Sequence, residues 1–275
     1  MAAFLKRFAQ NRLAVAGLVF LVLLVLVAIF ADFIAPYGPS ERSSEFRAPP
    51  SRDHWFGTDT IGMDVFSRVV YGARVSLKIG ILATIMALAI GVTYGAVAGF
   101  FGGVVDTIMM RFTDVFLSIP YVILAVAIAT VFGRSENALI LVLGSIGWLP
   151  ISRIVRATFL SLRKLEYAEA AKALGFGRAR MIFGHLLPNA AVPIIVYGTI
   201  AVGGVILSEA ALSFIGVGPQ YPTPAWGLMV NEASGSLTNA AHTLFFPSFA
   251  IFFTVLAFVF VGDGLRDALD PKMRV

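Results

Sequence analysis

Long apolar runs alternate with short polar segments along the whole chain. Six of these runs approach or exceed the roughly 20 residues that an α-helix needs to cross a bilayer. The pattern therefore predicts an all-α integral membrane protein with six transmembrane helices. The predicted spans are residues 13–34, 77–100, 113–133, 137–155, 190–212 and 244–262.

The composition agrees with a membrane protein and excludes a large soluble core. The chain is 58% hydrophobic and 13% charged, whereas soluble proteins carry about 25% charged residues. A net charge of +5 in a soluble protein could indicate nucleic-acid binding. Here the basic residues flank apolar runs, so they indicate orientation in the membrane. We expect contact with membrane lipid and no nucleic-acid partner.

The N-terminal segment resembles a secretory signal because Lys6, Arg7 and Arg12 precede an apolar run. A secretory apolar region is only about 7–15 residues long, and this run is longer. We therefore expect an uncleaved first helix at 13–34, preceded by a cytoplasmic segment at 1–12.

The distribution of Lys and Arg predicts that both termini are cytoplasmic. With the N-terminus inside, the inner segments hold fourteen basic residues and the outer segments six, and basic residues favour the inner side. Residues 35–76 are then extracytoplasmic and residues 263–275 cytoplasmic. Within 35–76, an extended loop is expected first, followed by an interfacial amphipathic helix over Asp59–Ser76.

The remaining five spans form a core over 77–262, which contains a polar, helix-forming segment at 157–188. Leu165–Leu174 has the composition of a helix, and Gly175 is placed to end it in a left-handed conformation. A second helical stretch, Arg178–Leu187, is expected to end at Pro188.

This polar segment is predicted to dock on a partner. Ala170, Ala171 and Ala173 give the first helix a slim surface that could enter a groove. Glu169 could anchor it through a charge-assisted hydrogen bond. The alternative is an amphipathic helix that lies on the inner leaflet without a partner.

Four charged residues near the span ends are candidates for gating or for structural pairing. Asp106, Arg111 and Asp114 lie at the inner junction of the second and third spans. Arg111 and Asp114 could pair on one helix face, and Asp114 is expected near a helix N-terminus. Glu209 lies near the outer end of the fifth span. It could pair, face a water-filled cavity or emerge into the interface.

Small residues recur at Gly91, Gly95 and Gly99 in the second span. This spacing produces a flat helix face, which usually allows a second helix to pack closely.

Motifs for bound cofactors and for catalysis are missing from the sequence. There is no cysteine, no phosphate-binding Gly-Lys-Ser/Thr motif and no His-Glu-x-x-His pattern. We therefore expect no cofactor, metal or catalytic residue on this chain.

In its motifs the chain resembles a permease subunit of a binding-protein-dependent ABC importer. The family pattern Glu-Ala-Ala, three residues, Gly, nine residues, an aliphatic residue, any residue, Leu-Pro matches Glu169-Ala170-Ala171, Gly175 and Leu187-Pro188. His185 replaces the aliphatic residue, as in the peptide/nickel branch.

The chain most resembles the second permease of dipeptide/oligopeptide systems. Further matches to this branch are His54 to Asp59, Gly62 to Asp64, Tyr71 to Leu77, Gly102-Gly103 with Asp106, Met110-Arg111 and Asp114, Glu209 to Gly216, Trp226-Gly227 and Gly262 to Asp267. Met63 departs from the Arg that this branch usually has.

The resemblance implies a type I ABC importer permease fold in a bacterial inner membrane. It implies a heterodimer with a homologous permease, two cytoplasmic ATPases that carry ATP and Mg, and an extracellular solute-binding protein. The transported solute would be an oligopeptide or dipeptide. The coupling helix that meets the ATPases would comprise Glu169, Ala170, Ala171, Leu174 and Gly175, with Leu187 and Pro188 beyond it.

Alternatives from other classes remain at this point. An ion-driven secondary transporter would need mid-membrane charges or broken helices. A membrane-embedded enzyme would need converging acid and base groups. A scaffold subunit without its own pathway is a third alternative, and a nickel chelate or a glutathione-like peptide could be the solute of the importer.

Overall fold

The computed structural model describes residues 2–236 and 238–269, and these are organised as helices joined by loops. The elements, in chain order, are α1 (Ala2–Gln10), α2 (Arg12–Ile29), α3 (Ala31–Ile34), α4 (Val65–Phe101), α5 (Gly103–Leu117), α6 (Tyr121–Phe132), α7 (Glu136–Leu162), α8 (Glu166–Ala173), the π-helix η1 (Arg180–Leu186), α9 (Leu187–Phe214), α10 (Trp226–Ser234) and α11 (His242–Leu269).

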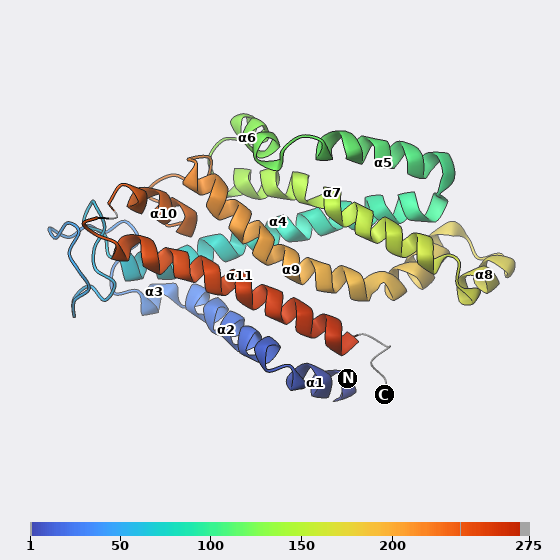
Figure 1. The fold of residues 1–275 in the computed structure, drawn as a ribbon, viewed down its shortest axis with the longest axis horizontal. Coiled ribbons are helices and arrows are strands. Elements are labelled where there is room, and N and C mark those ends of the chain that lie inside the picture. The colour runs from blue at the N-terminus through green and yellow to red at the C-terminus, as the bar shows by residue number, and fades with distance from the viewer. Residues whose placement is uncertain (1, 237, 270–275) are drawn as a thin grey trace.

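The long helices α2, α4, α7, α9 and α11 extend along the long axis of the molecule (Figure 1). Residues 35–64 form an extended segment at one end, beside α10, and we call this the loop end. The opposite end carries α8, and we call it the α8 end. The helix α1 and the last turn of α11 point toward the α8 end.

Five helices are long and apolar enough to cross a membrane: α2, α4, α7, the continuous helix of η1 and α9, and α11. A sixth span is possible if α5 and α6, bent by 88°, form one broken span. The predicted uninterrupted span at 113–133 is therefore wrong. Pro120 follows α5 and cannot continue its hydrogen-bond ladder, and proline also disfavours helical backbone at the residue before it.

The second span differs from its prediction at the N-terminal side. No separate interfacial helix covers residues 59–76, because α4 begins at Val65 and runs without a break to Phe101. Asp64 starts this helix: its carboxylate accepts a hydrogen bond from the Ser67 amide at 2.7 Å. Such side-chain caps satisfy an amide that would otherwise lack a partner.

The glycines of α4 allow it to pack against α7, as their spacing predicted. A β-carbon at Gly95 would lie 2.4 Å from the Ser152 carbonyl oxygen, and one at Gly99 would lie 2.6 Å from the Phe159 β-carbon. Both distances are shorter than real contacts, so only glycine fits this interface.

The terminal helices also extend beyond their predicted bounds or break inside them. The first predicted span is divided into α2 and α3 at Phe30. The last span continues to Leu269, so residues 263–269 are helical rather than a separate tail. Residues 270–275 of the predicted cytoplasmic C-terminus, and Met1, lie outside the described residues.

Candidate functional site

The helix α8 ends in a left-handed glycine cap, as the sequence predicted. Gly175 has a φ of +78°. Its amide donates to the Lys172 carbonyl at 3.0 Å, and the Phe176 amide donates to the Ala171 carbonyl at 3.2 Å. This pair of bonds is the Schellman motif, which satisfies the last carbonyls of a helix and turns the chain sharply.

One face of α8 is buried and the opposite face is exposed. Ala168 and Ala171 are buried, so Ala171 cannot belong to the docking surface that its sequence position suggested. Glu169 and Ala170 are exposed. Leu174 is 75% exposed at the helix end, so α8 presents an apolar side chain on its outer side.

The buried face of α8 belongs to a core cluster that reaches into the long helices. Because protein cores are close-packed, a displacement of α8 is transmitted to the helices that share this cluster. The cluster's buried members come from α4, α7, α8, η1 and α9: Ala87, Ala96, Ile151, Val155, Phe159, Ala168, Ala171, Met181, Leu186 and Ala190.

The helix after α8 does not end at Pro188. The segment η1 leads directly into α9, and Pro188 occupies the first turn of α9. Proline is tolerated there because the first turn of an α-helix needs no amide donor. Leu187 is the first residue of α9 and is partly buried, while Pro188 is exposed. Neither residue therefore breaks the connection between α8 and the fifth span.

A basic cleft of about 580 Å³ lies beside α8. Arg163 donates to the carbonyl oxygens of Gly99 and Phe100 at 3.2 Å each, so it caps the end of α4. Arg178 stacks over the Phe101 ring at 5.4 Å. Basic side chains at a helix C-terminus interact favourably with its dipole. The remaining charged residues of the cleft are Lys164, Glu169 and Lys172.

Two ion pairs join α5 to α7, and they correct the expected pairing of Arg111 with Asp114. Asp114 accepts from Arg153, and Asp106 accepts from Arg156, with one of the two bonds at 2.6 Å. Asp114 lies in the last turn of α5, not near its start. Asp106 occupies the first turn instead, where the helix dipole favours a carboxylate. Arg111 is exposed.

Glu209 is fully buried between α4 and α9 rather than exposed at the interface. Its carboxylate accepts hydrogen bonds from the Ser213 hydroxyl at 2.8 Å and from the Ser76 hydroxyl at 3.1 Å. Two hydroxyl donors reduce the cost of burying the carboxylate. The contact ties the fifth span to the second near the loop end.

A second buried charge cluster, at the loop end, was missed by the sequence reasoning. Arg68 of α4 is 1% exposed and pairs with both Asp59 and Glu232, the latter at 2.7 Å. It thereby joins the extended segment 35–64 to α4 and α10. The interfacial helix expected over Asp59–Ser76 would have left Arg68 at the membrane surface, and no local pattern indicates its burial.

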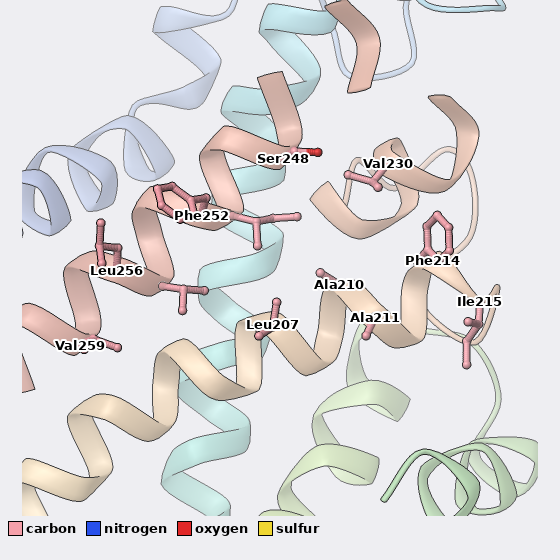
Figure 2. Close-up of a pocket in the computed structure, with 12 residues that line it drawn as sticks. Leu207, Ala210, Ala211, Phe214, Ile215, Val230, Ser248, Phe252, Leu256 and Val259 are labelled. Carbon is pink, nitrogen blue, oxygen red and sulfur yellow. The ribbon is translucent and has the colours of Figure 1, made fainter. Parts of the chain in front are cut away.

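An open apolar groove of about 640 Å³ lies between α9 and α11 near the loop end. Figure 2 shows that its walls come from these two helices, with Val230 of α10 at one side. Ser248 is the one hydroxyl-bearing residue that lines it. In a bilayer such a surface accommodates apolar groups and disfavours charged ones.

The described residues contain no group of three or more His, Asp or Glu side chains that could hold a metal ion.

Comparison with known proteins gives two family matches. Residues 91–275 match the family described as "Binding-protein-dependent transport system inner membrane component". Residues 1–50 match the "N-terminal TM domain of oligopeptide transport permease C".

Three relatives are similar over nearly the full chain. The dipeptide transport system permease protein DppC of Alkalihalophilus pseudofirmus is 44% identical, over 98% of this chain and 89% of the relative. The oligopeptide permease OppC of Bacillus subtilis is 41% identical, over 98% and 88%. The glutathione transport permease GsiD of Escherichia coli O6:K15:H31 is 40% identical, over 98% and 90%.

A chain of the MetNI methionine ABC transporter, solved in an inward-facing conformation, has a similar fold. Its TM-score is 0.63 at 19% identity, and the match covers 74% of this chain and 98% of that one. At this identity the likeness concerns the fold alone.

Proposed function

Since the chain belongs to the family of binding-protein-dependent transport system inner membrane components, we propose that it is the half of a peptide importer's translocation pathway that carries α8 as coupling helix. The chain is a non-catalytic, multi-pass permease component of the inner membrane. A homologous permease supplies the other half of the pathway. The solute is a dipeptide or an oligopeptide, which is supported by the names of relatives at 44% and 41% identity.

Glutathione is the second candidate solute. Glutathione permeases are 40% identical over the same 98% of this chain, so overall similarity separates the candidates only weakly. Glutathione is itself a short peptide, and either solute fits the same permease role.

In the proposed assembly, two cytoplasmic ATPases bind ATP and Mg, and each grips one coupling helix. Glu169, Ala170 and Leu174 form the exposed contact surface on this chain, while Gly175 fixes its end. Closure of the ATPases pulls on α8, and the shared core cluster carries this movement into α4, α7 and α9. Coupling of this kind requires that ATP and solute differ in affinity for the two states of the complex.

The orientation in the membrane follows from the same assembly. The α8 end, with α1, the last turn of α11 and the segment 157–188, faces the cytoplasm. The loop end, with residues 35–64 and α10, faces outward and meets the solute-binding protein. The excess of Lys and Arg in the segments assigned to the inside supports this orientation.

The observation that carries the proposal is the two-sided nature of α8. Its inner face is locked into the core that joins three long helices, while Leu174 projects outward with 75% of its surface exposed. An amphipathic helix that only lay on the inner leaflet would not need to pack into the core of the transmembrane helices.

Leu174→Asp tests the docking role directly, with Leu5→Asp as a matched control. Leu5 is also an exposed leucine, at 59%, on a helix directed toward the same end. Loss of an interface hot spot costs about 2 kcal/mol or more, which is roughly thirtyfold in affinity. Co-purification of the permease pair with a tagged ATPase should fall for Leu174→Asp and persist for Leu5→Asp. If both variants retain the ATPase equally, α8 is not the docking surface.

A further inference from the structure

The two ion pairs between α5 and α7 differ in accessibility. In the pair Asp106–Arg156 the side chains are 12% and 33% exposed, whereas in the pair Asp114–Arg153 they are 44% and 50% exposed. The first pair is therefore part of the packed interface. The Asp114–Arg153 pair is accessible from outside the molecule.

The open pair lies well away from the α8 end. Asp114 follows the start of α5 at Gly103 by eleven residues, which is about 16 Å of helix, and Arg153 precedes Arg163 by ten, about 15 Å. The helix α7 is one of the five candidate spans, and α5 is the first half of the bent pair that could form a sixth. Charged side chains at such positions are costly in lipid, and they face a water-filled cavity or the protein interior instead.

The surface of α7 around Arg153 also differs from a lipid-facing surface. Pro150, Arg153, Ala157 and Ser161 form its exposed stripe, at spacings of three and four residues. Among the described residues of α7, Leu141 is the one large hydrophobic side chain that is exposed. The lipid-type pattern is seen on α2, where a run of leucines and valines is exposed.

The groove between α9 and α11 makes the contrast sharper. It is lined almost entirely by apolar side chains (Figure 2), so it suits an apolar occupant. On the α5–α7 face, a guanidinium and a carboxylate lie side by side, next to exposed apolar side chains of α5 such as Val115.

We propose that the Asp114–Arg153 pair forms a binding site for a zwitterionic solute on the wall of the translocation pathway. The solute's carboxylate binds the Arg153 guanidinium, whose planar fork matches a carboxylate. Its ammonium group binds the Asp114 carboxylate. This inference rests on the proposed import of peptides, because a short peptide with free termini carries both charges.

The accessibility of the pair allows this exchange. An exposed ion pair contributes little to stability, so a solute that supplies the same two charges can replace the internal contact. The less exposed pair Asp106–Arg156 keeps α5 attached to α7 while the open pair changes partners.

Cysteine labelling tests the site cleanly, since the chain has no native cysteine. Arg153→Cys and Ala157→Cys would be placed in the complete importer in nanodiscs, and treated with a membrane-impermeant cationic methanethiosulfonate. Leu26→Cys, on the exposed leucine face of α2, is the lipid-facing control. We expect both α7 positions to react at least tenfold faster than the control. If their rates match the control, the face is lipid-facing and the inference is wrong.

The ligand class is tested by protection. Millimolar Ala-Ala should slow labelling at Ala157→Cys, which keeps both Arg153 and Asp114, at least threefold, while N-acetyl-Ala-Ala amide, which lacks both charges, should not. Labelling that neither peptide slows, or that both slow equally, would overturn the zwitterion site. Arg153→Gln should also raise the KM for uptake with little change in kcat. If the ion pair has only a structural role, the substitution should not raise the KM selectively.

A control in the same nanodiscs separates this inference from the proposed function. ATP hydrolysis stimulated by the loaded binding protein shows that the importer is assembled. If hydrolysis is stimulated but Ala157→Cys is neither fast nor protected, the zwitterion site alone fails. If no ATPase associates with the permease pair, the proposed function fails as well.

Discussion

The amide of Phe176 donates a hydrogen bond to the carbonyl oxygen of Ala171 at 3.2 Å, so the turn that ends α8 is fixed to the helix's buried side. This bond sets where Leu174 projects, because Leu174 lies between α8 and the glycine turn. The exposed leucine is thus held by backbone geometry and not by packing. The docking surface depends on that turn.

Gly175→Ala tests the turn. Gly175 has a φ of +78°, and a left-handed conformation costs a non-glycine residue about 1–2 kcal/mol. We expect weaker ATPase association, by roughly five- to thirtyfold, in pull-downs with purified complexes. Gly177→Ala is the matched control, because Gly177 lacks a positive φ and has open space around it. Equal behaviour of the two alanine variants would contradict the role of the turn.

Gly95→Ala should loosen the packing of α4 on α7. The added β-carbon would lie 2.4 Å from the Ser152 carbonyl oxygen, and overpacking of this kind costs about 1–3 kcal/mol. The thermal unfolding midpoint in detergent should fall by several degrees. Gly204→Ala, which meets nothing within 4 Å, should keep or raise it, because alanine favours helix more than glycine. A midpoint unchanged by Gly95→Ala would show that the two helices are not packed as described.

Arg68→Met should release the extended segment at the loop end. Without its cation, the cluster leaves the Asp59 and Glu232 carboxylates unpaired, and breaking a buried pair costs about 3–5 kcal/mol. Arg68→Lys should be milder, because one nitrogen of Arg68, Nη1, makes both contacts. Limited proteolysis of residues 35–64 reports the difference. Cleavage that is equally slow in both variants would mean that the cluster does not hold the segment.

Glu209→Gln should be tolerated, whereas Glu209→Ala should not. The carboxylate accepts from the hydroxyls of Ser76 and Ser213; a glutamine of similar shape can accept from one hydroxyl through Oε1 and donate to the other through Nε2. Alanine leaves two buried hydroxyls without their partner, at about 1–3 kcal/mol. The thermal unfolding midpoint of the purified permease pair measures the stability of both variants. A glutamine variant as unstable as the alanine variant would show that the negative charge itself is needed.

The sequence was sufficient for features that depend on local patterns. Apolar runs located the spans because the bilayer imposes their length. Gly175 was recognised because few other residues adopt its backbone conformation. The glycine spacing in α4 predicted close packing, although it could not identify α7 as the partner.

Features that depend on tertiary contacts were missed. The partner of Asp114 is Arg153, 39 residues away, so the nearer Arg111 was a plausible but incorrect choice. Arg68 lies on the same helix as apolar neighbours, and nothing local indicated that α10 supplies Glu232. The break at Pro120 was available in the sequence, but the apolar residues on both sides concealed it.

The central claim, that α8 couples this permease to ATP hydrolysis, is tested most directly by hydrolysis in reconstituted liposomes. Wild type and Glu169→Arg would be co-assembled with the partner permease, the ATPases and the binding protein. Glu169 is exposed and outside the buried face of α8, so the substitution should leave the fold intact. Loaded binding protein should stimulate hydrolysis in wild type and not in Glu169→Arg. Equal stimulation of both complexes would contradict the account.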